Sequence, residues 1–224
     1  MNDLNHVAFI MDGNGRWGLK KKKSRNYGHL EGVKTVQKIV QASISFKIPI
    51  ISFYVFSTEN WKRPSSEINY LFNLITIYFN KEINNLIKNN IKIVISGRLQ
   101  NLSSKIRKIL KSAVNKTRKN NKLIVNLAIN YGAKTEIIDA IKKINSVSWK
   151  VKEENIDKNL YTDLSFPDIL VRTGGQKRLS NFMLWQLAYT EIFFLDKLWP
   201  DFKKNDLSKI IKNYHKIKRN FGEI

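Results

Sequence analysis

Short apolar runs rich in β-branched residues alternate with longer segments of helical periodicity along the whole chain. Because no hairpin signal separates the runs, the alternation favours a mostly parallel sheet of about six strands with helices on its faces. No internal repeat or low-complexity linker is present, so we expect a single α/β domain over residues 1–224. The predicted strands are 7–11, 50–56, 92–96, 123–129, 169–172 and 192–195, and the predicted helices are 28–46, 65–89, 102–118, 134–146, 181–190 and 206–218.

One predicted helix, 65–89, carries a broad apolar stripe. Its apolar residues recur at steps of three and four, which indicates a face buried in the core. The wall of an apolar tunnel would show the same pattern, so the sequence leaves both interpretations open. The stripe consists of Ile68, Leu71, Phe72, Ile75, Phe79, Ile83 and Leu86.

The chain is strongly basic, with 40 Lys+Arg against 18 Asp+Glu and a formal net charge of +22. Such a charge suits a nucleic-acid or anionic-membrane partner. Here the basic residues are spread along the whole chain among abundant asparagine and isoleucine, so we favour a compositional bias over a dedicated nucleic-acid surface. A substrate that carries phosphate groups would be attracted in either case.

The sequence contains no cysteine, which excludes a disulfide framework, a thiol nucleophile and a cysteine zinc site. The N-terminal stretch lacks the basic start and long apolar core of a signal peptide. No apolar run approaches the ~20 residues that span a bilayer. We therefore expect a soluble, cytoplasmic protein.

The stretch MDGNGRWG, residues 11–18, follows the first predicted strand and contains the spacing G-x-G-x-x-G. A dinucleotide site needs a helix opening at the third glycine and an acid about 20 residues further on. Here Gly18 is followed by the charged stretch LKKKKSRNYGH, and Glu59, the acid after the second strand, comes much later. The context therefore excludes a dinucleotide site, and the absence of G-K-[ST] excludes a P-loop.

The same loop suits a phosphate site of another design. Gly13 and Gly15 allow backbone N–H groups to turn inward at the strand end. A lone carboxylate such as Asp12 repels phosphate unless a divalent cation such as Mg²⁺ lies between them. Asp12 could also cap the turn, and we favour the metal role. The candidate phosphate ligands are Arg16, Arg25 and His29.

A second candidate anion site is the stretch VRTGGQKRLSNF, between a predicted strand and the helix predicted from residue 181. Two arginines, a glycine pair and a helix N-terminus suit a diphosphate group. Two phosphate sites at one sheet edge suggest two phosphorylated substrates, and hence a transferase. The residues of this site are Arg172, Gly174, Gly175, Arg178 and Ser180.

Motifs along nearly the whole chain resemble those of the cis-prenyltransferases, and of bacterial undecaprenyl diphosphate synthases in particular. They occur in the family's order and with similar spacing. The motifs are HVAFIMDGNGRWG, GH at 28–29, FSTENWKRP, NYG at 130–132, RTGG, RLSNF, LWQLAYTEIFF and WPDF.

The resemblance implies the fold and the reaction of this family. The expected fold is a parallel sheet flanked by helices, with a hydrophobic tunnel for the growing chain. The expected reaction is the Mg²⁺-dependent cis addition of isopentenyl diphosphate units to farnesyl diphosphate, which gives undecaprenyl diphosphate, the lipid carrier of cell-wall synthesis. It also implies a homodimer, peripheral membrane contact for product release and no dedicated nucleic-acid partner.

The resemblance also assigns roles to residues of this chain. Asp12 corresponds to the essential metal-binding acid, Glu191 to a second Mg²⁺ ligand and Asn60 to the proposed proton acceptor. The C-terminal stretch KRNFGEI resembles a tail that the family places near the partner subunit. The substrate-binding residues implied are Gly13, Asn14, Gly15, Arg16, Trp17, Arg25 and His29 for the allylic diphosphate, Ser57, Thr58, Glu59, Trp61 and Arg63 beside it, and Arg172, Arg178, Leu179 and Ser180 for isopentenyl diphosphate.

The chain departs from the family pattern at three loop positions. Many bacterial members have Glu where Gln176 stands, often His in place of Lys177, and Gly-Asp where this chain has Gly97 followed by Arg98. These departures bear on substrate affinity and leave the reaction type unchanged.

Two other functions stay open from the sequence. A nucleic-acid-binding protein would use the +22 charge but would leave both glycine-arginine loops unexplained. A catalytically idle partner subunit would have no need to retain Asp12, Asn60, Arg172, Arg178 and Glu191 together.

Overall fold

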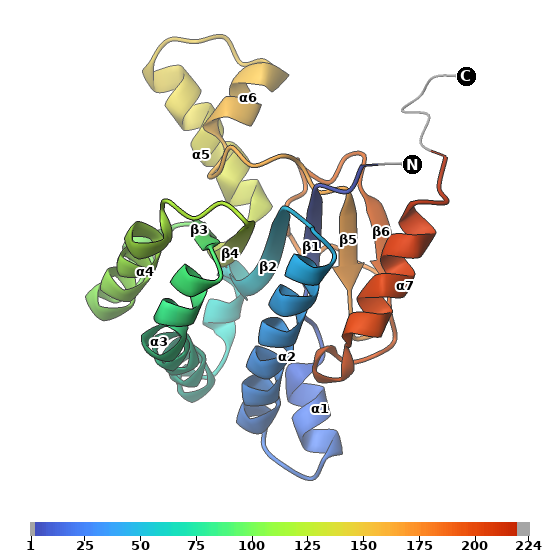
Figure 1. Cartoon of the computed structure of the whole chain (residues 1–224). Helices are drawn as coiled ribbons and strands as arrows, with labels where there is room; N and C mark the ends of the chain where they lie inside the picture. Colours follow the sequence, from blue (N-terminus) through green and yellow to red (C-terminus); the bar gives the residue numbers. More distant parts are fainter. Residues whose placement is uncertain (1–2, 219–224) are drawn as a thin grey trace.

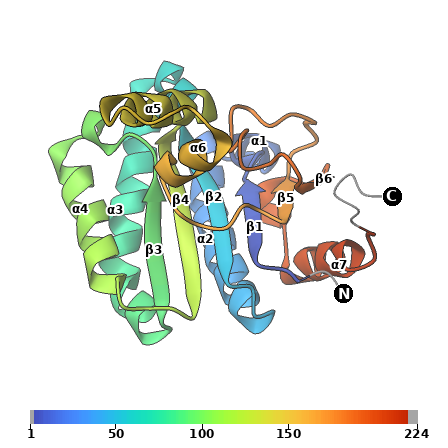
Figure 2. The ribbon, with the colours of Figure 1, turned by 90° about the horizontal axis from the view of Figure 1, so that it is seen from above.

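The computed structural model describes residues 3–218 and places six strands in one sheet whose neighbouring strands all run parallel (Figures 1 and 2). The strand order is β3-β4-β2-β1-β5-β6. On one side of β1 the chain adds β2, the edge strand β3 and then β4 between them, and it returns to add β5 and β6 on the other side. The strands are β1 (His6–Ile10), β2 (Ile50–Ser57), β3 (Ile91–Ser96), β4 (Leu123–Tyr131), β5 (Ile169–Arg172) and β6 (Glu191–Phe194).

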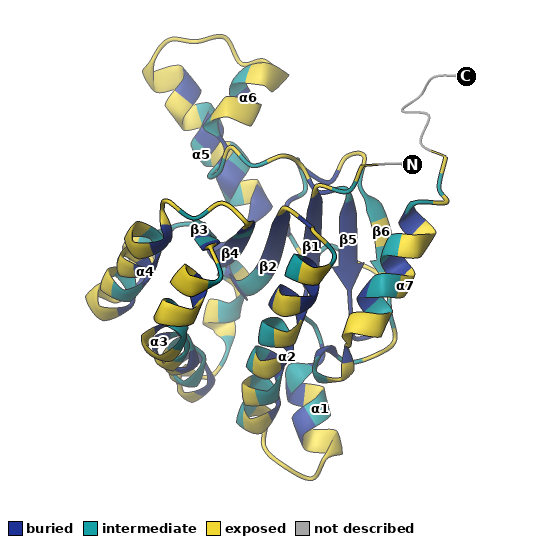
Figure 3. Cartoon of the chain, viewed as in Figure 1, coloured by how far each residue is buried: buried dark blue, intermediate teal, exposed yellow. Residues whose placement is uncertain are grey.

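Seven α-helices and three short 3-10 helices join these strands in the described part of the chain. Figure 3 shows that the central strands are buried, whereas the helices expose their outer faces. None of the described helices is long and apolar enough to cross a membrane. The helices are α1 (Asn14–Lys20), α2 (Arg25–Ser45), α3 (Ser65–Lys88), α4 (Ser104–Thr117), α5 (Ala133–Ser146), α6 (Glu153–Asn159) and α7 (Lys204–Tyr214), with η1 (Thr58–Lys62), η2 (Leu99–Asn101) and η3 (Trp199–Asp201).

The two faces of the sheet bury different cores, because successive strand residues point to opposite faces. Val7 and Phe9 of β1 belong to the large core, to which α2, α3, α4 and α7 contribute. Ala8 and Ile10 belong to a smaller core on the other face. That face is covered by the irregular segment that contains Phe182, Met183 and Leu187.

The prediction of six mostly parallel strands is confirmed, while the helix predicted at 181–190 is wrong. This segment forms turns, and Ser180, Asn181 and Met183 have positive φ angles of 51°, 63° and 46°. A right-handed helix cannot include such residues. The apolar periodicity of the segment arises because its side chains pack flat against the sheet.

Two helices were not predicted, and for different reasons. The segment that forms α1 contains two glycines and leads into a lysine run, a composition that favours a loop. Its glycines instead permit close helix packing, since a Cβ on Gly18 would lie 2.2 Å from the backbone oxygen of Ser24, the N-cap of α2. The short helix α6 has one apolar residue, the buried Ile156, so its sequence shows little hydrophobic periodicity.

A chain of buried polar side chains crosses four neighbouring strands. His6 Nε2 lies 2.7 Å from Ser52 Oγ, which also accepts a hydrogen bond from Asn126 Nδ2 at 2.9 Å. Ser96 Oγ donates to Asn126 Oδ1 at 2.7 Å. These four side chains are at most 2% exposed. Since a buried polar group must be paired, the chain of hydrogen bonds favours this register of β1, β2, β4 and β3.

We expect the protein to become less stable as the pH falls from 6.5 to about 4, because of the titration of His6. Burial lowers the pKa of His6 from 6.5 to about 4, despite its hydrogen bond to Ser165. In the unfolded chain His6 therefore binds a proton near pH 6.5, whereas in the folded protein it stays neutral down to about pH 4. The associated stability is present above pH 6.5 and is lost as the pH falls to about 4, a loss of about 3 kcal/mol.

Denaturant unfolding at pH 7, 6 and 5 tests this expectation. The variant His6→Asn cannot titrate there, so its stability should change less over this range than that of the wild-type protein. Both proteins keep His29 and His215, and the difference therefore isolates His6. Equal pH slopes for the two proteins would contradict the assignment.

Candidate functional site

A cavity of about 890 Å³ extends from the carboxyl ends of the central strands into the space between the sheet, α2 and α3. This position is the switch point of the sheet, because β1 pairs with β2 on one side and with β5 on the other, and ligands bind at such points in open α/β sheets. The interior is apolar and includes Val36, Leu71, Ile75, Phe79 and Ile129. The stripe of α3 is therefore partly cavity wall and partly core.

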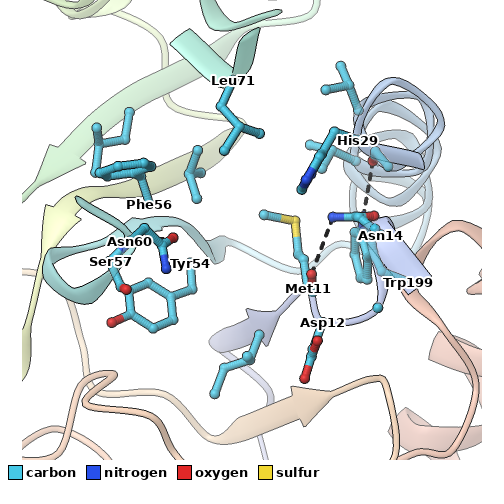
Figure 4. A pocket seen from close by; sticks show the side chains of 18 of the residues that line it. Met11, Asp12, Asn14, His29, Tyr54, Phe56, Ser57, Asn60, Leu71 and Trp199 are labelled. Carbon is cyan, nitrogen blue, oxygen red and sulfur yellow. Dashed lines mark hydrogen bonds between the residues drawn. The ribbon is translucent and has the colours of Figure 1, made fainter. Parts of the chain in front are cut away.

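The mouth of the cavity is rich in cations. Figure 4 shows Ser57 and Asn60 across the cavity from Asn14 and His29, with Asp12 below Asn14 in this view. The charged and imidazole side chains that line the cavity are Asp12, Arg16, Arg25, His29, Glu59, Arg63, Arg172 and Arg178.

Asp12 joins the two candidate anion sites. Its Oδ1 lies 3.1 Å from Arg16 Nη2, and its Oδ2 lies 3.0 Å from Arg172 Nη2. The backbone holds the carboxylate in place, because Asp12 O accepts hydrogen bonds from Thr173 Oγ1 at 2.8 Å and Trp199 N at 3.1 Å. The residue stays 28% exposed, so its carboxylate remains accessible from the mouth.

The glycines of the first loop are needed where they stand. Gly13 has a φ of 110° and forms the N-cap of α1, a conformation that favours glycine. A Cβ on Gly15 would lie 2.7 Å from the guanidinium carbon of Arg25. The loop thereby brings the first turn of α1 against the first turn of α2.

Arg172 is the most buried cation of the site, at 3% exposure. It donates from Nη1 to Ser180 Oγ at 2.8 Å and to the backbone oxygen of Arg178. Its buried Nε has no partner among the described residues. An unpaired buried donor is costly, so the site has capacity for a further acceptor here.

Glu67, on the first turn of α3, is a charged residue of the site that sequence reasoning did not include. Its carboxylate accepts hydrogen bonds from Arg25 Nε at 3.1 Å, from His29 Nε2 at 3.2 Å and from Arg63 Nη1 at 3.2 Å. It therefore holds together three side chains from α2 and the end of η1. The excess of predicted arginines at the site could have indicated that a further carboxylate must balance their charge.

The electrostatics of this cluster follow from burial and charge. Burial alone would raise the pKa of the Glu67 carboxyl, but Arg25, Arg63 and His29 hold it below its ordinary value. Burial lowers the pKa of His29 although Glu67 opposes the shift. We conclude that Glu67 is ionised and that His29 is neutral at pH 7.

The loop after β2 positions Asn60 by local hydrogen bonds. Asn60 Oδ1 accepts from Ser57 N at 3.2 Å, as part of a capping box that begins η1. Glu59 Oε1 accepts from Asn181 Nδ2 at 2.9 Å, which ties this loop to the segment after β5. Tyr54 Oη, also missed from the sequence, donates to Ser180 O at 3.2 Å and lines the cavity.

Most of the predicted site residues line this one cavity. Those that do are Asp12, Gly13, Asn14, Gly15, Arg16, Arg25, His29, Ser57, Glu59, Asn60, Arg63, Arg172, Arg178 and Ser180.

The remaining predicted site residues lie outside its lining. Trp17 donates from Nε1 to Asp201 at 2.9 Å and stacks on Tyr27. Trp61 donates from Nε1 to Asn130 at 2.8 Å and is 42% exposed. These tryptophans fix loops around the mouth. The full set outside the lining is Trp17, Thr58, Trp61, Gly174, Gly175, Leu179 and Glu191.

Glu191 lies at the other edge of the sheet from Asp12. It begins β6 opposite Ile169, the first residue of β5, whereas Ile10 of β1 pairs with Arg172, the last. Three residues of strand span about 10 Å, and Asp12 lies beyond that end. Within one chain, the structure does not bring Glu191 to the other site residues.

Two of the departures from the family pattern have defined contacts. Gln176 Oε1 accepts from Arg178 Nη1 at 2.6 Å, so it orients a mouth arginine without neutralising it. Arg98 forms a bidentate pair with Asp139 of α5, at 2.8 and 2.6 Å, and does not line the cavity.

The fold and the site define a class of protein: an α/β protein with an apolar cavity that opens at a cation-rich mouth. A family model described as "Putative undecaprenyl diphosphate synthase" matches residues 10–222. The chain is 40% identical to an isoprenyl transferase of Fusobacterium nucleatum, over 98% of this chain and 96% of the relative. It is 44% identical to an isoprenyl transferase of Halalkalibacterium halodurans, over 98% of this chain and 89% of the relative.

Two solved structures have the same fold and similar sequences. A probable undecaprenyl diphosphate synthase of Campylobacter jejuni is 38% identical, with a TM-score of 0.87 over 100% of both chains. Lavandulyl diphosphate synthase of Lavandula x intermedia, in complex with dimethylallyl diphosphate, is 28% identical, with a TM-score of 0.93 over 98% of both chains. The chain belongs to the undecaprenyl diphosphate synthase family and is a prenyltransferase of cis-prenyl chain elongation.

We expect Glu67→Gln to loosen the mouth without unfolding the protein. Loss of the charge leaves Arg25 and Arg63 without their common partner, and the free energy of unfolding should fall by about 1–3 kcal/mol. Since Glu67 opposes the downward shift of the His29 pKa, His29 should titrate at a still lower pH in the variant. NMR titration of the histidines and denaturant unfolding measure both effects.

Glu31→Gln is the matched control, because Glu31 pairs with exposed Lys34 on the surface of α2. It should change neither the His29 titration nor the stability beyond about 0.5 kcal/mol. An unchanged His29 titration in Glu67→Gln would show that this carboxylate does not govern the mouth.

Proposed function

We propose that this chain extends an allylic diphosphate, farnesyl diphosphate, by successive cis addition of isopentenyl diphosphate units. The product would be a long polyprenyl diphosphate, undecaprenyl diphosphate, for cell-wall lipid carrier synthesis. The observation that carries the proposal is one cavity that joins a cation-rich mouth to an apolar interior. A diphosphate head and a prenyl tail have the matching pair of properties.

The two anion sites suggest how two diphosphates could be held at once. Arg16, Arg25 and His29, with the backbone of Gly13 to Gly15, would bind the allylic diphosphate. Arg172, Arg178 and Ser180 would bind isopentenyl diphosphate, and the unpaired Nε of Arg172 supports an acceptor at that position. Asp12 contacts one arginine of each set. The other residues proposed to contact or orient substrate are Trp17, Ser57, Thr58, Glu59, Trp61, Arg63 and Leu179.

The donor chemistry at Asp12 fits Mg²⁺ bound together with substrate. The described residues include no group of three or more side chains suited to a metal. Mg²⁺ commonly takes one or two carboxylates and completes its shell with phosphate oxygens and water. When bound, the ion would supply positive charge to the departing diphosphate. Arg16 and Arg25 would add fixed donors for the same charge.

Asn60 has two proposed roles, as proton acceptor or as a positioning group. Formation of the new carbon–carbon bond leaves a cation that must lose a proton to a nearby base. An amide is a poor base, and the Asn60 carbonyl oxygen already accepts from Ser57 N. We therefore favour a positioning role, with the released diphosphate taking the proton.

We also propose that the protein is a homodimer. The hairpin of α5 and α6 stands away from the sheet (Figure 1) and exposes Val147, Trp149 and Val151 by 54%, 52% and 53%. The edge strand β6 exposes Ile192 and Phe194. Apolar side chains at a protrusion and a sheet edge are suited to a second copy. Glu191 could serve as a Mg²⁺ ligand only if a second copy brought it to a mouth.

The stretch KRNFGEI, expected to lie near a partner subunit, spans residues 218–224. Residues 219–224 lie outside the described part of the chain. Cytoplasmic location with peripheral membrane contact also stays a proposal, supported by the long apolar product that the enzyme would release.

The test of the reaction is incubation with farnesyl diphosphate, labelled isopentenyl diphosphate and Mg²⁺, followed by extraction and sizing of the lipid. We expect a long-chain product that is absent when Mg²⁺ is chelated. Asp12→Ala should lower the rate by at least 10²-fold, since fixed charge stabilisation at a reacting group is worth about that much. Asp163→Ala, which removes an exposed acid outside the lining, should keep the rate. No product with any allylic primer would contradict the proposal.

The role of Asn60 can be read from a series of variants. A positioning role predicts that Asn60→Ala is slow, by about 10²-fold, and that Asn60→Asp does not regain the full rate. The pH profile of the rate should keep its shape in the slow variant. Full activity of Asn60→Asp beside an inactive Asn60→Ala would instead indicate that the side chain at this position takes the proton.

A further inference from the structure

The turn between α1 and α2 projects beyond the carboxyl ends of the strands (Figure 1), and its surface is exposed (Figure 3). The two helices that it joins also line the mouth of the cavity, since α1 contributes Arg16 and α2 contributes Arg25 and His29. Close packing of α1 against α2 fixes the turn in this place. The turn is therefore a surface directly beside the mouth.

Apolar side chains are exposed on and beside this turn. Leu19 is 56% exposed, Tyr27 37% and Leu30 36%. Tyr27 stacks on the partly buried ring of Trp17, with the ring centroids 5.9 Å apart, so its position is defined. Apolar groups that gather on one part of a surface indicate a contact site. We call this surface the hairpin tip, and it consists of Leu19–Lys23, Tyr27 and Leu30.

The hairpin tip is also strongly cationic. Lys20–Lys23 are all exposed, and the chain between Asp12 and Glu31 contains six Lys or Arg residues and no acid. None of these four lysines takes part in an ion pair within residues 3–218. Lys21 Nζ instead lies 5.6 Å from the centroid of the Trp17 ring. The charge of the tip is therefore available to an anionic partner.

The combination of cations with apolar groups distinguishes the hairpin tip from other basic surfaces of the protein. The outer face of α4 exposes Lys105, Lys108 and Lys111, but no large apolar side chain is exposed along this helix. Contact with the phosphates of a nucleic acid requires only cations. A surface that lies on a membrane combines basic residues with apolar side chains that enter the headgroup region. The composition of the tip therefore favours a lipid partner.

We propose that the hairpin tip docks on the surface of an anionic lipid bilayer. Lys20–Lys23 would lie among the headgroups, with Leu19, Tyr27 and Leu30 at the boundary of the acyl chains. The position of the tip gives the docking a purpose, and this step rests on the proposed function. With the tip on the bilayer, the mouth opens beside lipid, and a long apolar product can leave the cavity with less exposure of its surface to water.

Sedimentation with lipid vesicles tests the docking. The wild-type protein should bind vesicles that contain phosphatidylglycerol, should bind pure phosphatidylcholine vesicles much less, and should be released as salt screens the charges. The triple variant Lys20→Gln, Lys22→Gln, Lys23→Gln should lower the partition coefficient by about 10²-fold, since each lysine near an anionic surface contributes about fivefold. Unchanged binding by this variant, or equal binding to both lipids, would overturn the inference.

A matched control removes the same charge elsewhere. The triple variant Lys105→Gln, Lys108→Gln, Lys111→Gln lies on the exposed face of α4 and should lower the partition coefficient by about threefold or less, through long-range attraction alone. An equal loss in the two triple variants would show that the net charge attracts the protein without a defined surface, and would contradict docking through the hairpin tip.

The apolar part of the contact can be measured at one position, because the chain contains no cysteine. A fluorophore sensitive to its surroundings, attached to Leu19→Cys, should shift its emission to the blue when anionic vesicles are added. Ile77→Cys is the control, since Ile77 is 52% exposed on α3 and does not line the cavity; its label should not shift. A label at position 19 that stays in water while the protein binds would overturn the lipid assignment and indicate a surface for polyanions such as RNA.

The failure of this inference is distinguishable from the failure of the proposed function, because vesicle binding is measured without substrate. Product formation without vesicle binding would overturn the docking alone. Vesicle binding without product formation would support the docking and contradict the proposed function. Melting curves show that each variant is folded, and gel filtration shows its oligomeric state. A changed oligomeric state in the variant of Lys20, Lys22 and Lys23 would assign the tip to a second copy of the chain and overturn the lipid assignment.

Discussion

The parallel pairing of β1 with both β2 and β5 places every part of the site. Because the chain returns to the opposite side of β1 after β2, β3 and β4, the carboxyl ends of β1, β2 and β5 lie together at the switch point. Asp12 follows β1, Ser57 ends β2 and Arg172 ends β5. A change in strand order would separate these residues even if every helix and strand still formed. The buried hydrogen bonds from His6 to Ser96 add a polar constraint on the same arrangement.

The arginines at the mouth of the cavity would repel one another in the absence of substrate. Two carboxylates offset this repulsion. Asp12 pairs with arginines from both candidate diphosphate sites, while Glu67 pairs with Arg25, Arg63 and His29. These contacts keep the cations in place before a diphosphate arrives. Asp12 thereby connects α1 with the end of β5, and Glu67 connects α2 with α3, so the mouth is ordered by the same groups that would bind substrate.

Many elements of this fold could be predicted from local pattern, and the errors have physical causes. The strands are apolar, β-branched runs, and the stripe on α3 is a periodic feature that requires no long-range information. The segment 181–190 has the composition of a helix, but contact with the sheet favours turns with positive φ at Ser180, Asn181 and Met183. In α1 the converse holds, since the glycines typical of loops allow this helix to approach α2 closely. Glu67 was missed because a glutamate at a helix start is common for local reasons.

The sequence by itself determined the class of fold, the glycine-arginine loops at the strand ends and the family of the enzyme, because each is written in residues that are near one another in the chain. The tertiary structure alone decided which of these residues share one cavity. It placed Glu191 at the far edge from Asp12 and made Glu67 the counter-charge of three cations. The physical reason is that charge pairing and the shape of a cavity depend on distances between side chains from different elements, and those distances are fixed only when the helices pack on the sheet.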